Sequence, residues 1–198
     1  MLILIPAAGA SSRMRGRDKL LELVDKHPLL ARQIGIALQT PATVLVTLPP
    51  DARDRTAIVE GIVDDRLEAL IVDDAEEGLA ASLRAAVRFA AKQEHDPEAL
   101  MILLADMPEI EAADLHRLMQ AFDGKTVVRA TDADGRVGHP VIIPPRLFPD
   151  LDGLSGDQGA RRALDGEHII TVPLAGHRAT TDLDTPEDWA AWRRKTGR

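Results

Sequence analysis

The sequence of 198 residues contains no cysteine, which excludes disulfide bonds, thiolate metal ligands and cysteine nucleophiles. Aromatic residues make up only 3% of the chain and tyrosine is absent, which argues against an aromatic platform for stacked bases. No apolar run approaches the roughly 20 residues of a membrane span. The apolar run from Met1 to Ile5 has no preceding basic residue and is shorter than the core of a signal peptide. We therefore expect a cytoplasmic protein with no membrane contact.

Basic residues are also fewer than acidic residues. The chain has 24 Lys and Arg residues against 32 Asp and Glu residues, a formal net charge of −8. This balance disfavours binding to nucleic acids or anionic membranes, although a local basic cluster could still bind a phosphate ligand. The apolar fraction of 45% and the charged fraction of 28% are typical of a globular protein. The length fits one domain, which we place at residues 1–198.

Short apolar segments alternate with longer amphipathic segments along the chain. We expect strands at 2–5, 43–48, 69–72, 100–104, 126–129, 140–143 and 168–172, and helices at 28–38, 51–63, 79–91 and 187–194. Continuous apolar strands separated by helices indicate a mostly parallel sheet that is covered on both faces. The fold class is therefore α/β, and ligands should bind beyond the carboxyl ends of the strands.

The segment 6–14 follows the first strand and is rich in small residues, which let backbone N–H groups approach an anion closely. Its Ser11 hydroxyl could add a further donor. Four cations then come within seven residues: Arg13, Arg15, Arg17 and Lys19. The segment could hold phosphates, or it could be a tight turn followed by a solvated basic loop. Composition alone favours neither.

Two groups of carboxylates follow apolar segments. Asp106 ends a strand and precedes Met-Pro, while Asp182 and Asp184 precede a Thr-Pro pair that begins the last helix. Carboxylate oxygens are suitable ligands for Mg²⁺, which commonly takes one or two of them together with substrate phosphates. Each aspartate could instead cap a turn or a helix start.

Three further places carry candidate side chains, and each has a purely structural alternative. His139 precedes a strand and could contact a phosphate, or it could be a satisfied histidine beside a proline turn. Gly156, Asp157 and Arg161 could form an anion-binding helix start or an ordinary capped helix. Ser82 could touch a nucleotide or simply lie on a helix surface.

Six segments, in order, resemble those of one enzyme family. They are 6–14 with Lys19, 77–84, 103–108, 138–141, 155–161 and 182–188. Together they resemble the MobA-like nucleotidyltransferases, and most closely the MocA-like molybdenum cofactor cytidylyltransferases. An additional residue, Arg15, places Lys19 one position later than in the family pattern. The resemblance implies a Rossmann-like nucleotide-diphospho-sugar transferase domain.

The resemblance also implies a reaction: the nucleoside monophosphate of CTP is joined to the phosphate of molybdopterin, and pyrophosphate leaves. It implies catalytic roles for Arg13, Lys19 and Asp106, and Mg²⁺ held by Asp106 and Asp182, with Asp184 as the reserve ligand. The implied nucleotide-binding residues are Ala7, Ala8, Gly9, Ser11, Arg13, Lys19, Gly78 and Ser82. The implied acceptor-binding residues are His139, Gly156, Asp157 and Arg161.

Two alternatives to this function stay open. The first is a GTP-dependent guanylyltransferase acting on molybdopterin or another phosphorylated acceptor; Ala8 resembles the cytidylyl form of the loop. The second is a non-catalytic carrier that delivers molybdenum cofactor to a partner molybdoenzyme or chaperone. Mg²⁺ dependence of nucleotide binding would distinguish the carrier from an enzyme.

Overall fold

The apolar segments form the centre of a seven-stranded sheet in the computed structural model, which describes residues 1–93, 97–156 and 162–198. Across the sheet the strands are β5 (Leu67–Ile71), β4 (Thr43–Leu48), β1 (Leu2–Pro6), β6 (Leu100–Ile102), β8 (Val137–Ile143), β7 (Val127–Thr131) and β9 (Ile169–Pro173). β4–β5, β1–β4, β1–β6 and β7–β9 pair in parallel, whereas β8 is antiparallel to both β6 and β7. The predicted α/β fold with a mostly parallel sheet is confirmed.

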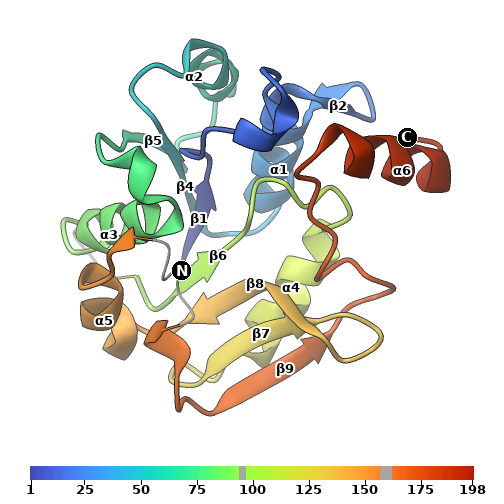
Figure 1. Cartoon of the computed structure of the whole chain (residues 1–198). Helices are drawn as coiled ribbons and strands as arrows, with labels where there is room; N and C mark the ends of the chain where they lie inside the picture. The colour runs from blue at the N-terminus through green and yellow to red at the C-terminus, as the bar shows by residue number, and fades with distance from the viewer. Residues whose placement is uncertain (94–96, 157–161) are drawn as a thin grey trace.

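Helices cover both faces of this sheet (Figure 1). They are α1 (Leu29–Leu38), α2 (Arg53–Glu60), α3 (Leu79–Ala90), α4 (Ala112–Ala121), α5 (Phe148–Asp152) and α6 (Pro186–Thr196). Residues of α1, α2 and α4 pack in one hydrophobic cluster with the sheet, and residues of α3 and α5 pack in another. Among the described residues, no helix combines the length and the apolar character that a membrane crossing requires.

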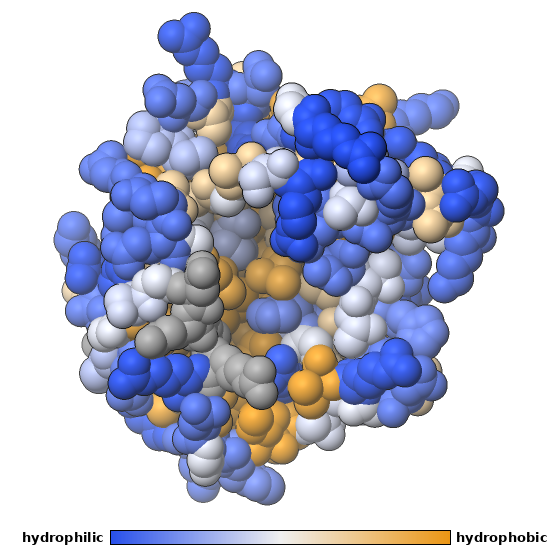
Figure 2. Space-filling view, in the orientation of Figure 1, coloured by the Kyte–Doolittle hydropathy of each residue, from blue (hydrophilic) through white to orange (hydrophobic). Residues whose placement is uncertain are grey.

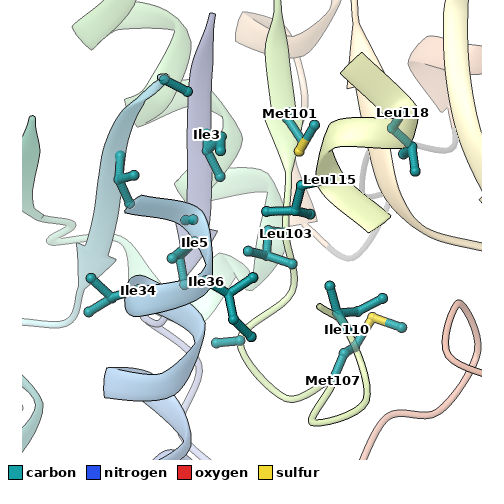
Figure 3. Packing of buried hydrophobic residues seen from close by; sticks show 14 of the residues in the cluster. Ile3, Ile5, Ile34, Ile36, Met101, Leu103, Met107, Ile110, Leu115 and Leu118 are labelled. Carbon is teal, nitrogen blue, oxygen red and sulfur yellow. The ribbon is translucent and has the colours of Figure 1, made fainter. Parts of the chain in front are cut away.

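Alternation along β1 explains the two layers. Ile3 and Ile5 belong to the cluster with α1 and α4, while Leu2 and Leu4 belong to the cluster with α3. Successive side chains of a strand point to opposite faces, so an unbroken apolar run fills both cores. Figure 3 shows Ile3 and Ile5 with Met101 and Leu103 on neighbouring segments, facing the helices that carry Ile34 and Leu115.

A third hydrophobic cluster fastens the C-terminal segment to the N-terminal part of the chain. It consists of Met14, Val24, Leu29, Leu183, Trp189 and Trp192. Figure 1 shows α6 beside β2 (Leu23–Val24), which pairs with β3 (His27–Pro28). α6 starts with a capping box in which the Thr185 side chain accepts from the Asp188 N–H. Trp189 and Trp192 are 2% and 4% exposed, so they serve packing.

The observed elements differ from the predicted ones in several places, of which three are described here. α2 is shorter than the predicted 51–63 helix, and β6 ends at Ile102 because its pairing with β8 stops at Val141. α4 is not predicted by the sequence analysis. It begins with a capping box between Glu111 and Asp114.

Candidate active site

The small-residue loop after β1 lies at the carboxyl edge of the parallel strands. The Ala7 N–H donates to the Thr47 carbonyl oxygen at 3.0 Å, which extends the pairing of β1 and β4 into the loop. Ala7 and Ala8 are buried, and Ser11 has a left-handed φ of 50°. A 3₁₀ turn, η1 (Ser12–Met14), follows, and the fully buried Met14 anchors it. The loop is therefore an ordered part of the fold.

Arg55, on the first turn of α2, holds this loop through hydrogen bonds from its guanidinium group. Its Nη1 donates to the carbonyl oxygens of Ala7 at 2.6 Å and Gly9 at 2.8 Å, and its Nη2 donates to Ser11 Oγ at 3.1 Å. The same guanidinium makes a bidentate contact with Asp18, at 2.6 and 2.8 Å. Burial raises the pKa of Asp18, but hydrogen bonds from Arg55 and the Leu20 N–H outweigh it, so this pKa lies below its ordinary value. The sequence analysis did not single out Arg55.

Lys19 bridges two carboxylates that are distant in sequence. It starts a second 3₁₀ turn, η2 (Lys19–Leu21), and its Nζ donates to Asp106 Oδ2 at 2.5 Å and Asp184 Oδ1 at 2.6 Å. Burial lowers the pKa of Lys19, but the charges and hydrogen bonds of Asp106 and Asp184 raise it by more, so the net shift of this pKa is upward. Arg13 Nη2 also lies 2.8 Å from Asp184 Oδ2. The structure thus brings together the predicted residues Arg13, Lys19 and Asp106 with the reserve residue Asp184.

Asp182 lies close to the same cluster. The Leu183 N–H donates to the Asp106 carbonyl oxygen at 3.1 Å, which fixes the terminal segment against the turn after β6. Burial raises the pKa of Asp182, and the negative charges of Asp106 and Asp184 raise it further. Three carboxylates therefore share one region with two cations.

The donor atoms of this cluster fit a divalent cation. Asp106 Oδ1 is buried and has no hydrogen-bond partner, which leaves an oxygen ligand available inside the site. Buried polar oxygens are normally satisfied, so an unpartnered one needs an explanation such as an ion. Mg²⁺ and Mn²⁺ prefer carboxylate oxygens of this kind. Asp106 together with Asp182 or Asp184 could hold such an ion.

A cavity of about 170 Å³ opens between the loop, α3 and the turn after β6. It is lined by Pro6, Ala7, Gly9, Lys19, Leu20, Gly78, Leu79, Ser82, Leu104, Ala105 and Asp106. Figure 2 shows a hollow at the centre of this face, with hydrophobic atoms at its floor and a hydrophilic rim. The cavity brings predicted residues from three distant segments, represented by Gly9, Ser82 and Asp106, into one site.

The predicted residues on α3 are placed by the fold itself. Ser82 is 1% exposed, and its Oγ accepts from Thr47 Oγ1 at 2.9 Å, so it does not lie on an ordinary helix surface. Gly78 has a φ of 67° and caps the helix start. Arg84 pairs with Asp74 and Glu77 and donates to the Leu154 carbonyl oxygen at 2.7 Å. These contacts hold the wall of the cavity that faces the loop.

Arg15 and Arg17 contact carboxylates outside the cavity. Arg15 Nη2 lies 2.7 Å from Glu187 Oε1, and Arg17 Nη1 lies 3.1 Å from Glu22 Oε1. Both arginine side chains are more than half exposed. The other two cations of the segment lie closer to the site: Lys19 lines the cavity, and Arg13 contacts the Asp184 carboxylate, which also binds Lys19.

His139 is largely enclosed near the site. Burial lowers its pKa to about 4, and Arg129 adds to this, while a hydrogen bond with the Ile102 backbone and the charge of Asp106 act in the opposite direction. Its Nδ1 is buried without a hydrogen-bond partner. The imidazole is therefore neutral near pH 7.

We expect His139→Gln to reduce the acid sensitivity of the fold. The unfolded chain protonates His139 near pH 6.5, whereas the folded chain resists protonation down to about pH 4. The free energy of unfolding therefore falls as the pH drops through this window. In His139→Gln this fall should be about 2 kcal/mol smaller than in the unaltered protein. Urea unfolding at pH 7 and pH 4.5 measures this difference. An identical fall in the free energy of unfolding for both proteins would show that His139 does not contribute to the acid sensitivity.

Gly138 is required by a close backbone approach. A Cβ atom at this position would lie 1.7 Å from the Ala179 carbonyl oxygen, which also accepts a 2.9 Å hydrogen bond from the His139 N–H. We expect Gly138→Ala to push the segment around Ala179 away and to lower the free energy of unfolding by about 1–3 kcal/mol. Gly35→Ala is the matched control, because nothing lies within 4 Å of its Cβ and alanine favours its helix. Equal stability of the two variants in urea would contradict the close approach.

A separate group of possible metal ligands lies at the end of β7. Among the described residues, Asp132, Asp134 and His177 place ligand atoms within 4.8 Å of one another. The Asp132 carboxylate already accepts from the N–H groups of Asp134 and Arg136 and from Thr180 Oγ1. These bonds show that the Asp132 carboxylate holds the turn between β7 and β8.

The predicted acceptor-binding segment is described only in part. The Gly156 N–H donates to Glu77 Oε2 at 3.3 Å, which places it beside the start of α3. Asp157 and Arg161 lie outside the described residues. Their predicted roles remain predictions.

Comparison with known proteins gives consistent matches over most of the chain. The MobA-like NTP transferase domain matches residues 3–172. The purine catabolism protein PucB of Bacillus subtilis is 30% identical, with 95% of this chain and 93% of that protein covered. The 2-C-methyl-D-erythritol 4-phosphate cytidylyltransferase of Salinibacter ruber is 28% identical, with 96% of this chain and 90% of that protein covered.

Solved structures include similar chains of nearly equal length. Rv0371c from Mycobacterium tuberculosis superposes with a TM-score of 0.81 at 26% identity, covering 96% of this chain and 95% of that chain. Its structure in complex with manganese gives a TM-score of 0.77 at 25% identity, with the same shares covered. The relatives fit the MocA-like subgroup that the sequence motifs resemble.

Proposed function

Because the chain belongs to the MobA-like NTP transferase family and is a nucleotidyltransferase, we propose that it joins the CMP of CTP to the phosphate of molybdopterin. The observation that carries the proposal is the cavity in which the small-residue loop meets Lys19 and Asp106. CTP as donor is supported by the cytidylyl form of the loop at Ala8 and by the similarity to a cytidylyltransferase. Molybdopterin as acceptor rests on the resemblance of the motifs to the MocA-like subgroup.

The reaction needs positioning and charge neutralisation more than covalent help. An oxygen of the acceptor phosphate forms a bond to the α-phosphorus, and the bond to the bridging oxygen breaks as pyrophosphate leaves with the electron pair. The attacking phosphate is already an anion, so no general base is required. The loop at 7–11 would hold the nucleotide, and Arg13 and Lys19 would neutralise the triphosphate.

Asp106 and Asp182, with Asp184 in reserve, would hold Mg²⁺. When bound, the ion would offset the negative charge of the phosphates. His139 is placed as an acceptor-side residue in this proposal, because it is a neutral group near Asp106 with an unpartnered nitrogen. Gly156, Asp157 and Arg161 are the other residues that we propose for binding of the acceptor.

Pyrophosphate release with each of ATP, CTP, GTP and UTP, with and without molybdopterin and Mg²⁺, tests the proposal. Release only with CTP, acceptor and metal is the expected result. Release with GTP would retain the reaction and replace the donor. Tight binding of molybdopterin without pyrophosphate release from any nucleotide would exclude catalysis on this acceptor. It would favour either a carrier that delivers the cofactor to a molybdoenzyme or a chaperone, or an enzyme that acts on a different phosphate.

A further inference from the structure

We propose that Arg55 is a positioning residue for the nucleotide: it sets the spacing between the small-residue loop and Lys19. The inference rests on the proposed function and goes beyond it, because Arg55 belongs to none of the motifs that resemble the family. The described residues that line the cavity include Ala7, Gly9 and Lys19 but not Arg55. Arg55 therefore acts through other groups and not by touching the nucleotide.

The first part of the argument is that Arg55 holds the beginning of the loop. Its guanidinium takes the carbonyl oxygens of Ala7 and Gly9 as acceptors, at 2.6 and 2.8 Å. Without this guanidinium, the partial negative charge of the two carbonyl oxygens would lie uncompensated beside an anionic ligand, or the oxygens would be enclosed without a hydrogen-bond donor. The Arg55 guanidinium binds both carbonyl oxygens and thereby holds the loop in one conformation.

The second part is that Arg55 also holds the end of the loop. Asp18 accepts from Arg55 Nε at 2.6 Å and Nη2 at 2.8 Å, and its Oδ1 also accepts from the Leu20 N–H at 3.0 Å. Asp18 is thereby the cap of the turn that starts with Lys19. One side chain from α2 consequently fixes both the loop and the backbone that carries the cation.

The third part concerns the strained residue between these two ends. Ser11 is in the left-handed region, which a residue with a side chain adopts at a cost. Its Oγ lies 3.1 Å from Arg55 Nη2 and donates to Asp18 Oδ1 at 3.1 Å. The guanidinium and the carboxylate hold Ser11 in this conformation. Without Arg55, the serine, the two carbonyls and Asp18 would all lose a partner together.

Lysine at position 55 keeps the charge but cannot donate from five N–H groups in one plane. We expect Arg55→Lys to weaken nucleotide binding and to lower kcat, because a displacement of about 1 Å at a reacting group can cost about 10²-fold in rate. The Arg55→Ala variant should show the larger loss. Addition of guanidinium ion to Arg55→Ala should restore part of the affinity, which a general loss of stability would not allow.

Arg66 provides a matched control. Its guanidinium also holds two backbone carbonyls and one aspartate, namely those of Leu38, Thr40 and Asp64. These residues precede β4 and β5, so the contacts lie at the opposite end of the parallel strands from the cavity. Arg66→Lys should reduce stability in the same way as Arg55→Lys while leaving nucleotide affinity unchanged.

The experiment is calorimetric titration of the full chain with CTP and with GTP in the presence of Mg²⁺, together with urea unfolding of each variant. We expect a rise of about 10-fold or more in Kd for Arg55→Lys, against less than twofold for Arg66→Lys. If the unaltered protein binds neither nucleotide, the proposed function fails. If it binds a nucleotide and folded Arg55→Lys binds it equally well, the positioning role of Arg55 is wrong.

Discussion

Replacing Asp106 with asparagine is expected to lower the rate of nucleotidyl transfer by about 10³-fold without unfolding the protein. The substitution keeps the size of the side chain and an oxygen that can accept from Lys19 Nζ, so the packing around β6 is retained. It removes the negative charge and weakens the oxygen ligand at the unpartnered Oδ1 position. The measurement is steady-state pyrophosphate release at saturating CTP, molybdopterin and Mg²⁺.

Asp65→Asn is the control for this substitution. Asp65 is exposed in the turn before β5 and is remote from the cavity, so the same chemical change there should leave the rate unaltered. Retention of more than about a tenth of the activity by Asp106→Asn would place the metal-binding and charge-balancing role elsewhere. Asp182→Asn and Asp184→Asn, measured under the same conditions, would then identify which carboxylate carries it.

Replacing Lys19 with methionine is expected to have opposite effects on two quantities. The rate of transfer should fall by about 10²-fold or more, because the triphosphate loses its main buried counter-charge. Binding of Mn²⁺ or Mg²⁺ to the nucleotide-free protein should become tighter by about 10-fold, because an ammonium group no longer occupies the space between Asp106 and Asp184. Methionine retains the unbranched stem of lysine, which limits the change in packing.

Two measurements separate these effects. Calorimetric titration of Mn²⁺ into the nucleotide-free protein measures the metal affinity, and pyrophosphate release measures the rate of transfer. Lys195→Met, on the exposed face of α6, changes the net charge equally and should alter neither quantity. Weaker metal binding in Lys19→Met would mean that the lysine supports the carboxylates in their binding geometry and does not compete with the ion.

Much of the fold can be predicted from the sequence because its strands are unbroken apolar runs. The segment 43–48 is predicted at its observed bounds, since all its residues from Val44 onwards are buried on one face or the other. α4 was missed although Leu115 and Leu118 are buried on one side of it. Its start depends on a capping box with glutamate at the cap, an uncommon choice that patterns of Ser, Thr, Asp or Asn do not identify.

The antiparallel direction of β8 was also not predictable from hydrophobic pattern. An apolar strand such as 140–143 can pair in either direction, and the direction depends on the connection through the turn at 132–135. That turn is recognisable by its aspartates, and the Asp132 carboxylate does hold it by accepting from two backbone N–H groups.

The candidate site was partly predictable for a similar reason. Lys19 and Asp106 both follow central strands of a parallel sheet, and such loops meet at one edge. Arg55 could not be found in this way, because its role depends on five acceptor contacts distributed over residues 7–18. Arg13 and Arg15 look equivalent in the sequence, yet one reaches Asp184 and the other reaches Glu187 on the exposed surface.

The contact between Lys19 and Asp184 joins residues 165 positions apart, and it has a consequence for the order in which the protein becomes functional. During synthesis, the loop and Arg55 emerge early, and Asp106 follows at mid-length. The last carboxylates arrive only after β9, the final strand of the sheet, has been made. Long-range contacts of this kind form late, once the loops between them have closed. A nascent chain would therefore complete the strands of its sheet and its nucleotide loop before it completes the charge cluster.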